Sequence, residues 1–223
     1  MDYELITPTK DLVLQYNAFW TEDRPESWEV ALFKGRDPVN ITSYISETEF
    51  RQMRDDDTRI VKYVTAKDLT ALTEINKVYH TRMNAKLVVE KLESWDNLCE
   101  MDLDEFVNFC KEVTTIKTYS FATKVFSFIK QNCPILDSYV VTLLDYYLSK
   151  KKETDHIEYP DKSNWGSYEA FRNAYDAFRA AYQLKDCNYK QIDHFLWTYG
   201  KALQAYWQTN GVLAFGSVPY QEP

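Results

Sequence analysis

A lysine and an aspartate near the middle of the chain, Lys124 and Asp137, are candidates for nucleophilic chemistry. Lys124 stands on an otherwise apolar stretch, SFATKVFSFIK, and Asp137 follows thirteen residues later. A desolvated lysine amine is a usable nucleophile. A carboxylate held at a helix N-terminus can stabilise a developing cation. The pair therefore predicts attack by the Lys124 amine with assistance from Asp137.

Two helices separated by a proline must position this pair. The first helix is predicted by apolar residues that surround Lys124 at helical spacing: Phe121, Val125, Phe128 and Ile129. Pro134 lacks an N–H and disfavours helical geometry at Cys133, so the first helix ends before it. Asp137 and Ser138 are good N-cap residues, so a second helix begins there.

A purely structural interpretation of the same residues stays open. Asp137 then serves only as the N-cap of the second helix, and Lys124 is a residue at the edge of a helix face whose stem is buried and whose amine reaches water.

The pattern T-K-V, an apolar helix, and then P-apolar-apolar-D-S-x-V resembles the signature of the helix-hairpin-helix DNA glycosylases, and within them the 8-oxoguanine DNA glycosylase branch and its bacterial relatives. The likeness covers about thirty residues. It implies that Lys124 attacks the sugar C1′ and forms a Schiff base, that Asp137 assists, and that no metal or organic cofactor is needed. On this resemblance, the candidate substrate-binding residues are Tyr139, Phe128, Thr123 and Lys117.

The segment also departs from the family pattern. The hairpin glycines, which let a backbone approach a DNA phosphate closely, are replaced by Thr118-Tyr119-Ser120-Phe121-Ala122. The spacer between lysine and aspartate is shorter, and Tyr139 stands where the 8-oxoguanine branch has histidine. These departures favour a second hypothesis, a non-enzymatic all-α binding module that keeps the glycosylase-like fold without the chemistry.

The composition and the helical spacing of apolar residues along the chain predict an all-α protein of about ten helices. Seventeen Tyr, twelve Phe and six Trp accompany only five Gly, which suits long helices and short loops. We expect a helical domain over 1–150 with the helix-hairpin-helix-like segment at about 100–150, a linker over 151–166, and a closing helical pair with an irregular tail over 167–223. The aromatic stripes of 168–184 and 189–208 are expected to pack against each other as an antiparallel pair.

Charge is distributed unevenly along the chain. The net charge is −8, which argues against a general nucleic-acid binder. Residues 111–152, however, hold seven lysines against three acidic residues. DNA is therefore a candidate partner through this local basic face, although a simple solvated surface explains the same lysines.

Several other functions lack support in the sequence. The four cysteines and three histidines are scattered, which argues against a metal site or a disulfide framework. We interpret Asp55-Asp56-Asp57 as a solvated acidic turn, and 59–64 as an extended connector. No P-loop or G-x-G-x-x-G occurs. No apolar run is long enough for a membrane span and no signal peptide is recognised, so we expect a cytoplasmic protein.

Overall fold

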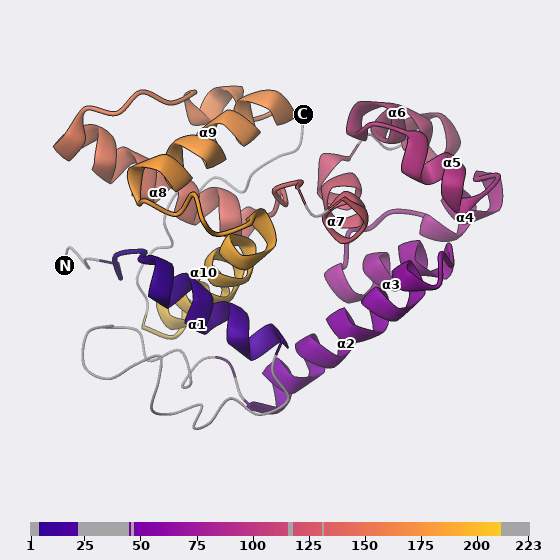
Figure 1. The fold of residues 1–223 in the computed structure, drawn as a ribbon, viewed down its shortest axis with the longest axis horizontal. Coiled ribbons are helices and arrows are strands. Elements are labelled where there is room, and N and C mark those ends of the chain that lie inside the picture. The colour runs from indigo at the N-terminus through magenta and orange to yellow at the C-terminus, as the bar shows by residue number, and fades with distance from the viewer. Residues whose placement is uncertain (1–4, 22–44, 46, 116–117, 131, 211–223) are drawn as a thin grey trace. The chain divides into compact units, whose positions relative to one another are not determined.

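The computed structural model describes residues 5–21, 45, 47–115, 118–130 and 132–210 (Figure 1). In these residues all regular structure is helical, with ten α-helices, one short 3-10 helix and no strand, which confirms the predicted all-α class. None of the described helices combines the length and the apolar character needed to cross a membrane. The helices are α1 Lys10–Thr21, α2 Glu47–Thr65, α3 Thr70–Tyr79, α4 Ala85–Lys91, α5 Trp95–Glu100, α6 Leu103–Thr114, α7 Tyr119–Ile129, α8 Ser138–Asp155, α9 Tyr168–Ala181 and α10 Tyr189–Asn210.

The chain divides into two compact units. One unit is discontinuous and consists of Met1–Arg51 and Asp137–Pro223, and the other is the continuous segment Gln52–Leu136. The boundary between Leu136 and Asp137 falls inside the stretch 1–150 that the sequence groups as one domain. Helix α8 also continues to Asp155, into the segment expected to be a linker.

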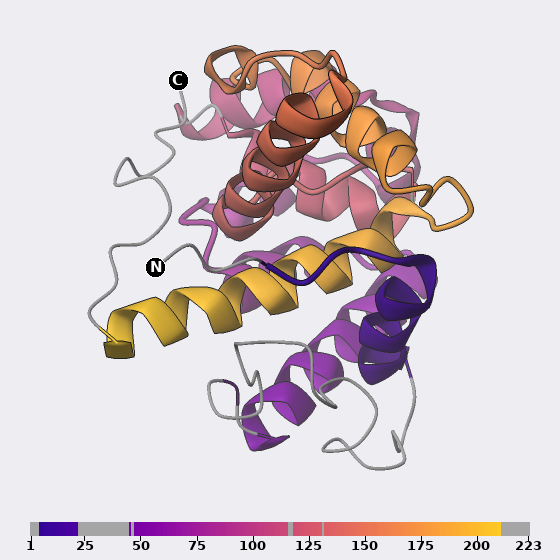
Figure 2. The same cartoon turned by 90° about the vertical axis from the view of Figure 1, so that its left-hand side faces the viewer.

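In the discontinuous unit, α10 packs against both α1 and α8 (Figures 1 and 2). Helix α1 turns an apolar face toward α10, where the Tyr16 and Phe195 rings meet edge to face at 5.0 Å. The two aromatic stripes meet on α8. There, Tyr147 lies 5.7 Å from the Phe178 ring of α9 and 6.5 Å from the Phe195 ring of α10. Helix α8 therefore supplies a common surface for both stripes. The sequence predicted only a direct pairing of the two aromatic helices and gave α8 no part in it.

In the continuous unit, α3 packs against α4 and α7, and α6 packs against the same two helices. Helix α6 begins at a full capping box, because the Asp102 carboxylate accepts the Glu105 N–H and the Glu105 carboxylate accepts the Asp102 N–H. Its Phe106 ring lies 6.1 Å from Phe121 and 5.7 Å from Phe126, both on α7. These contacts bury the aromatic face of α7.

Helix α2 corrects two expectations. The predicted acidic turn at 55–57 and the predicted extended connector at 59–64 are both parts of this one continuous helix. Arg59 offsets the negative charge, because it pairs with Asp56 one turn earlier at 2.7 Å and with Glu74 of α3 at 2.9 Å. Arg54 also lies 3.4 Å from Asp55, so at least two of the three adjacent carboxylates have an arginine partner on α2, and the run is compatible with a helix.

Candidate functional site

Lys124 lies in the middle of α7. The helix begins at Thr118, whose side chain accepts the Phe121 N–H, and eight consecutive residues of α7, Phe121–Phe128, are buried. Lys124 is one of them and is only 2% exposed. Its Nζ donates a hydrogen bond of 3.0 Å to Ser120 Oγ and lies 5.8 Å from the centre of the Tyr79 ring. The amine is thus enclosed. The structural interpretation of the sequence instead expected Lys124 at the edge of a helix face, with its amine in water.

Thr123, a predicted substrate-binding residue, has a structural role in the same unit. Its fully buried hydroxyl donates to the Tyr119 carbonyl at 2.7 Å and accepts the Leu136 N–H at 3.1 Å. It therefore ties the extended residues before Asp137 back to α7. The spacing of the T-K-V pattern alone does not predict this structural role of its threonine.

Phe128, another predicted substrate-binding residue, belongs to the core of the continuous unit. Its side chain is buried, and its ring lies 6.3 Å from that of Tyr79. Lys117, the remaining basic candidate, lies outside the described residues.

Asp137 is the N-cap of α8, as the sequence predicts. Its backbone is extended, with φ −133° and ψ 149°, and its carboxylate accepts the Tyr139 N–H at 3.0 Å. Tyr139 itself is half-buried, and its ring meets Trp197 of α10 edge to face at 5.8 Å. The pKa of Tyr139 is raised, chiefly because the phenol is buried and further because Asp137 and Glu49 are negatively charged.

The predicted site residues divide between the two units. Lys124, Thr123 and Phe128 belong to the continuous unit, whereas Asp137 and Tyr139 belong to the discontinuous unit. The discontinuous unit adds three residues that the sequence did not select, Glu49, Trp197 and Lys201. Lys201 pairs with Glu49, and its Nζ lies 5.2 Å from the centre of the Trp197 ring. Because the Lys201–Glu49 pair joins residues 152 positions apart, no local pattern could have predicted it.

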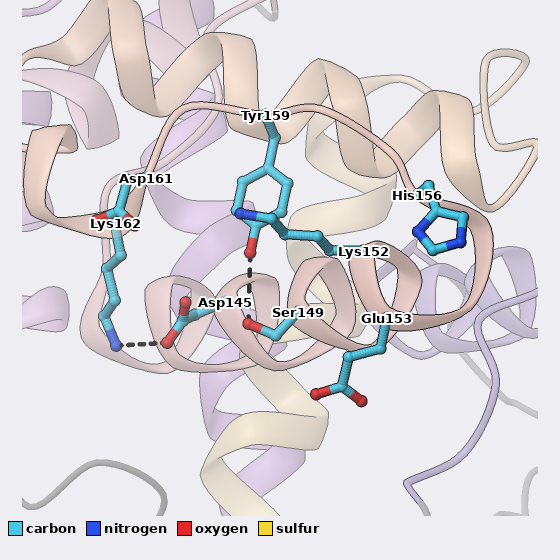
Figure 3. Close-up of a pocket in the computed structure, with 8 residues that line it drawn as sticks. All are labelled: Asp145, Ser149, Lys152, Glu153, His156, Tyr159, Asp161 and Lys162. Atoms are coloured by element: carbon cyan, nitrogen blue, oxygen red, sulfur yellow. Dashed lines mark hydrogen bonds and ion pairs between the residues drawn. The ribbon is translucent and has the colours of Figure 1, made fainter.

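A polar groove of about 540 Å³ lies along the second half of α8 and the segment that follows it (Figure 3). One ion pair and one contact between a cation and an aromatic ring lie within the groove. Lys162 pairs with Asp145 at 2.9 Å, and the Lys152 ammonium lies 5.6 Å from the centre of the Tyr159 ring. The groove contains none of the residues that the sequence selected. It is lined by Asp145, Ser149, Lys152, Glu153, His156, Tyr159, Asp161 and Lys162.

Within the described residues, no group of three or more His, Cys, Asp or Glu side chains could hold a metal ion. The four cysteines are free thiols, and three of them, Cys110, Cys133 and Cys187, are buried as expected of small apolar side chains. Burial raises the pKa of the Cys110 thiol to about 12, so this thiol is protonated and is not a nucleophile at neutral pH.

Comparison of the chain with protein-family models, with curated proteins and with solved structures gives no match.

Proposed function

We propose that the chain is a base excision enzyme of the DNA glycosylase and AP lyase type, with Lys124 as the Schiff-base nucleophile and Asp137 as the assisting carboxylate. The observation that carries the proposal is the enclosure of the Lys124 amine, which is 2% exposed on an aromatic helix. Burying an amine is costly, and a helix gains nothing in stability from a lysine where leucine or methionine would fit. Such a cost is typical of a functional residue.

The proposed reaction uses groups that the chain itself supplies. The Lys124 nitrogen lone pair attacks C1′ of a damaged nucleotide, the bond from C1′ to the base breaks, and its electron pair leaves with the base, which takes up a proton. The new secondary amine loses a proton, and the ring oxygen then leaves C1′ as the iminium forms. The iminium acidifies the neighbouring C2′ proton, whose loss expels the 3′ phosphate and nicks the strand.

Asp137 fits the second role through its position at the helix terminus. A carboxylate can stabilise the positive charge that develops on the sugar as the base departs. Its hydrogen bond to the Tyr139 N–H at 3.0 Å fixes its orientation. The lysine-rich stretch 111–152 supports a DNA substrate, because phosphate binding needs a local excess of positive charge.

The enclosure of Lys124 has a mechanistic consequence. A sugar carbon cannot approach an amine that is 2% exposed, so the proposal requires that DNA binding opens a path to Nζ where it lies. Such opening belongs to the motions with which many enzymes admit their substrates.

A second candidate function is a non-enzymatic helical binding module. The net charge of −8 favours it, as does the structural use of Thr123, whose hydroxyl bonds to Tyr119 and Leu136. In this case Lys124 and Asp137 serve the fold alone, and their replacement lowers stability without removing any chemistry.

Borohydride trapping tests the proposal directly. The protein is incubated with duplexes that carry 8-oxoguanine, uracil or an abasic site, borohydride is added, and covalent protein–DNA complexes are separated by denaturing electrophoresis. We expect a complex with wild type and none with Lys124→Met, a change that keeps the length of the side chain but removes the amine.

Lys130→Ala is the matched control on the same segment, since Lys130 is the C-cap of α7 and its Nζ donates to the Met101 carbonyl at 2.7 Å. This variant should still form the complex. The absence of a complex on every duplex, from wild-type protein shown to be folded, would reject the Schiff-base mechanism and favour the binding module.

A further inference from the structure

We infer that Tyr79 and Asp57 act as positioning residues for Lys124, an inference that rests on the proposed function. All three residues belong to the continuous unit. None of the sequence patterns connects them, because they come from three separate helices: Asp57 from α2, Tyr79 from the end of α3, and Lys124 from α7.

The first step is the place of the amine nitrogen. Four rotatable bonds give a lysine amine wide freedom, and a nucleophile is effective only when its position is restricted. Ser120, one turn earlier on α7, accepts a hydrogen bond from Nζ at 3.0 Å. The Tyr79 ring lies 5.8 Å from Nζ, within the range at which the negative face of an aromatic ring attracts a cation.

The second step is the orientation of the ring. Tyr79 is the last residue of α3, and His80 ends the helix in the left-handed conformation, with φ 49°. The Tyr79 hydroxyl donates to the Asp57 carboxylate at 3.3 Å, and its ring packs 6.3 Å from that of Phe128. The ring is thus held at its hydroxyl end by Asp57, which is itself buried.

The third step is the chemistry. When an amine attacks C1′, its nitrogen gains a positive charge, and the iminium that follows is also a cation. An aromatic face favours both species. A phenol that donates to a carboxylate carries more electron density, so Asp57 strengthens the attraction as well as fixing the ring. Tyr79 and Asp57 therefore act on the charge that the reaction creates, without touching the substrate.

Three variants separate the ring from its hydroxyl. Tyr79→Leu removes the aromatic face, Tyr79→Phe keeps the face but removes the bond to Asp57, and Asp57→Asn keeps an acceptor but removes the charge. Tyr119→Phe is the matched control, because Tyr119 also donates to a carboxylate, Asp104, at 2.5 Å in the same unit.

The first measurement is borohydride trapping on the preferred duplex. We expect Tyr79→Leu to lower the trapping rate at saturating DNA by roughly tenfold, the size of one desolvated cation–π contact. The DNA concentration that gives half the maximal rate should not change. Tyr79→Phe and Asp57→Asn, which keep the aromatic face but lose the bond to the Asp57 charge, should both give rates between those of Tyr79→Leu and wild type, and Tyr119→Phe should match wild type. Equal rates in wild type and Tyr79→Leu, or equal losses in Tyr79→Leu and Tyr79→Phe, would overturn the inference.

The second measurement needs no DNA. In protein labelled with ¹³C-lysine, the side-chain resonances of Lys124, assigned by their loss in Lys124→Met, should be shifted upfield by the Tyr79 ring current. The shift should persist in Tyr79→Phe and vanish in Tyr79→Leu. If the shift survives in Tyr79→Leu, the positioning role of Tyr79 is contradicted, and the proposed reaction is not affected. If the upfield shift is present in wild type and lost in Tyr79→Leu, but the protein traps no DNA, the contact is real and the proposed reaction is wrong.

Discussion

Gly200 of α10 lies directly against Tyr139 of α8: a Cβ atom built on Gly200 would stand 2.9 Å from the Tyr139 Cβ and 3.3 Å from the Tyr139 carbonyl oxygen. Real Cβ atoms do not approach one another so closely, so this glycine is what lets α10 reach the first turn of α8. Trp197 and Lys201, which are neighbours of Gly200 on α10, owe their places beside Tyr139 and Glu49 to this contact.

Gly200→Ala should therefore destabilise the protein although alanine is the better helix former. The gain in helix propensity is about 1 kcal/mol, and the cost of overpacking is about 1–3 kcal/mol. Because the clashing atoms are a Cβ and a backbone oxygen, no side chain can rotate away. We expect a net loss of roughly 1 kcal/mol in urea unfolding, and an unchanged or raised stability would show that α8 and α10 can separate at little cost.

Thr123→Val should lower the free energy of unfolding by about 1–3 kcal/mol, because the isosteric change leaves the buried Leu136 N–H without its acceptor. Thr142→Val is the control. Its hydroxyl is exposed and bonds only to the Ser138 carbonyl one turn earlier, so its removal should change stability by less than about 0.5 kcal/mol. Similar losses in the two variants, measured by urea unfolding, would contradict the role given to Thr123.

Asp137 combines a cap with the proposed catalytic charge, and two replacements separate them. Asp137→Ala removes the cap and should cost about 1 kcal/mol, whereas Asp137→Asn keeps an N-cap acceptor and should cost only a few tenths. Both should slow trapping of an abasic duplex. If Asp137→Asn traps the abasic duplex at the wild-type rate, Asp137 is only the N-cap of α8 and has no part in the reaction.

His194 makes stability depend on pH. Its ring is buried, stacks on Trp20 at 4.5 Å, and shares a hydrogen bond of 2.9 Å with Asn17. Burial, with a smaller contribution from the charge of Lys190, holds the pKa of His194 well below the usual 6.5. Below pH 6.5 this histidine is therefore protonated in the unfolded chain but not in the folded chain. The free energy of unfolding then falls with pH, by up to about 1.4 kcal/mol per pH unit.

Denaturant unfolding between pH 7 and pH 5 measures this dependence. In His194→Gln the slope over that range should be smaller than in wild type. The same replacement at the exposed His156 is the matched control. Parallel curves for wild type and His194→Gln would mean that the histidine is protonated within the fold.

Lys124 should be protected from amine reagents in the free protein. Because its side chain is 2% exposed, acetic anhydride should modify it at least about tenfold more slowly than Lys67, whose side chain is 67% exposed. Peptide mapping by mass spectrometry gives both rates, and protection should disappear in urea. Equal rates in the folded protein would show that the amine is already accessible, and no opening step would then be needed.

Local signals in the sequence predicted the all-α class and the Asp137 cap, because the first depends on composition and spacing and the second on residues within one turn. The prediction of a turn and a connector over 55–64 was wrong because it left out Arg54 and Arg59, which pair with Asp55 and Asp56 on the same helix and offset their charge. Tyr79 and Asp57 were missed because no spacing rule brings the end of α3, the middle of α2 and α7 together.

The discontinuous unit has a consequence for how the chain is made. The Trp20 indole donates to Thr198, a partner that lies 178 residues later. During synthesis from the N-terminus, α1 emerges long before α10 exists to cover its apolar face, whereas every residue of Gln52–Leu136 is present once that segment has left the ribosome. The continuous unit is thus free to fold first, whereas the apolar face of α1 stays uncovered until α10 has been synthesised.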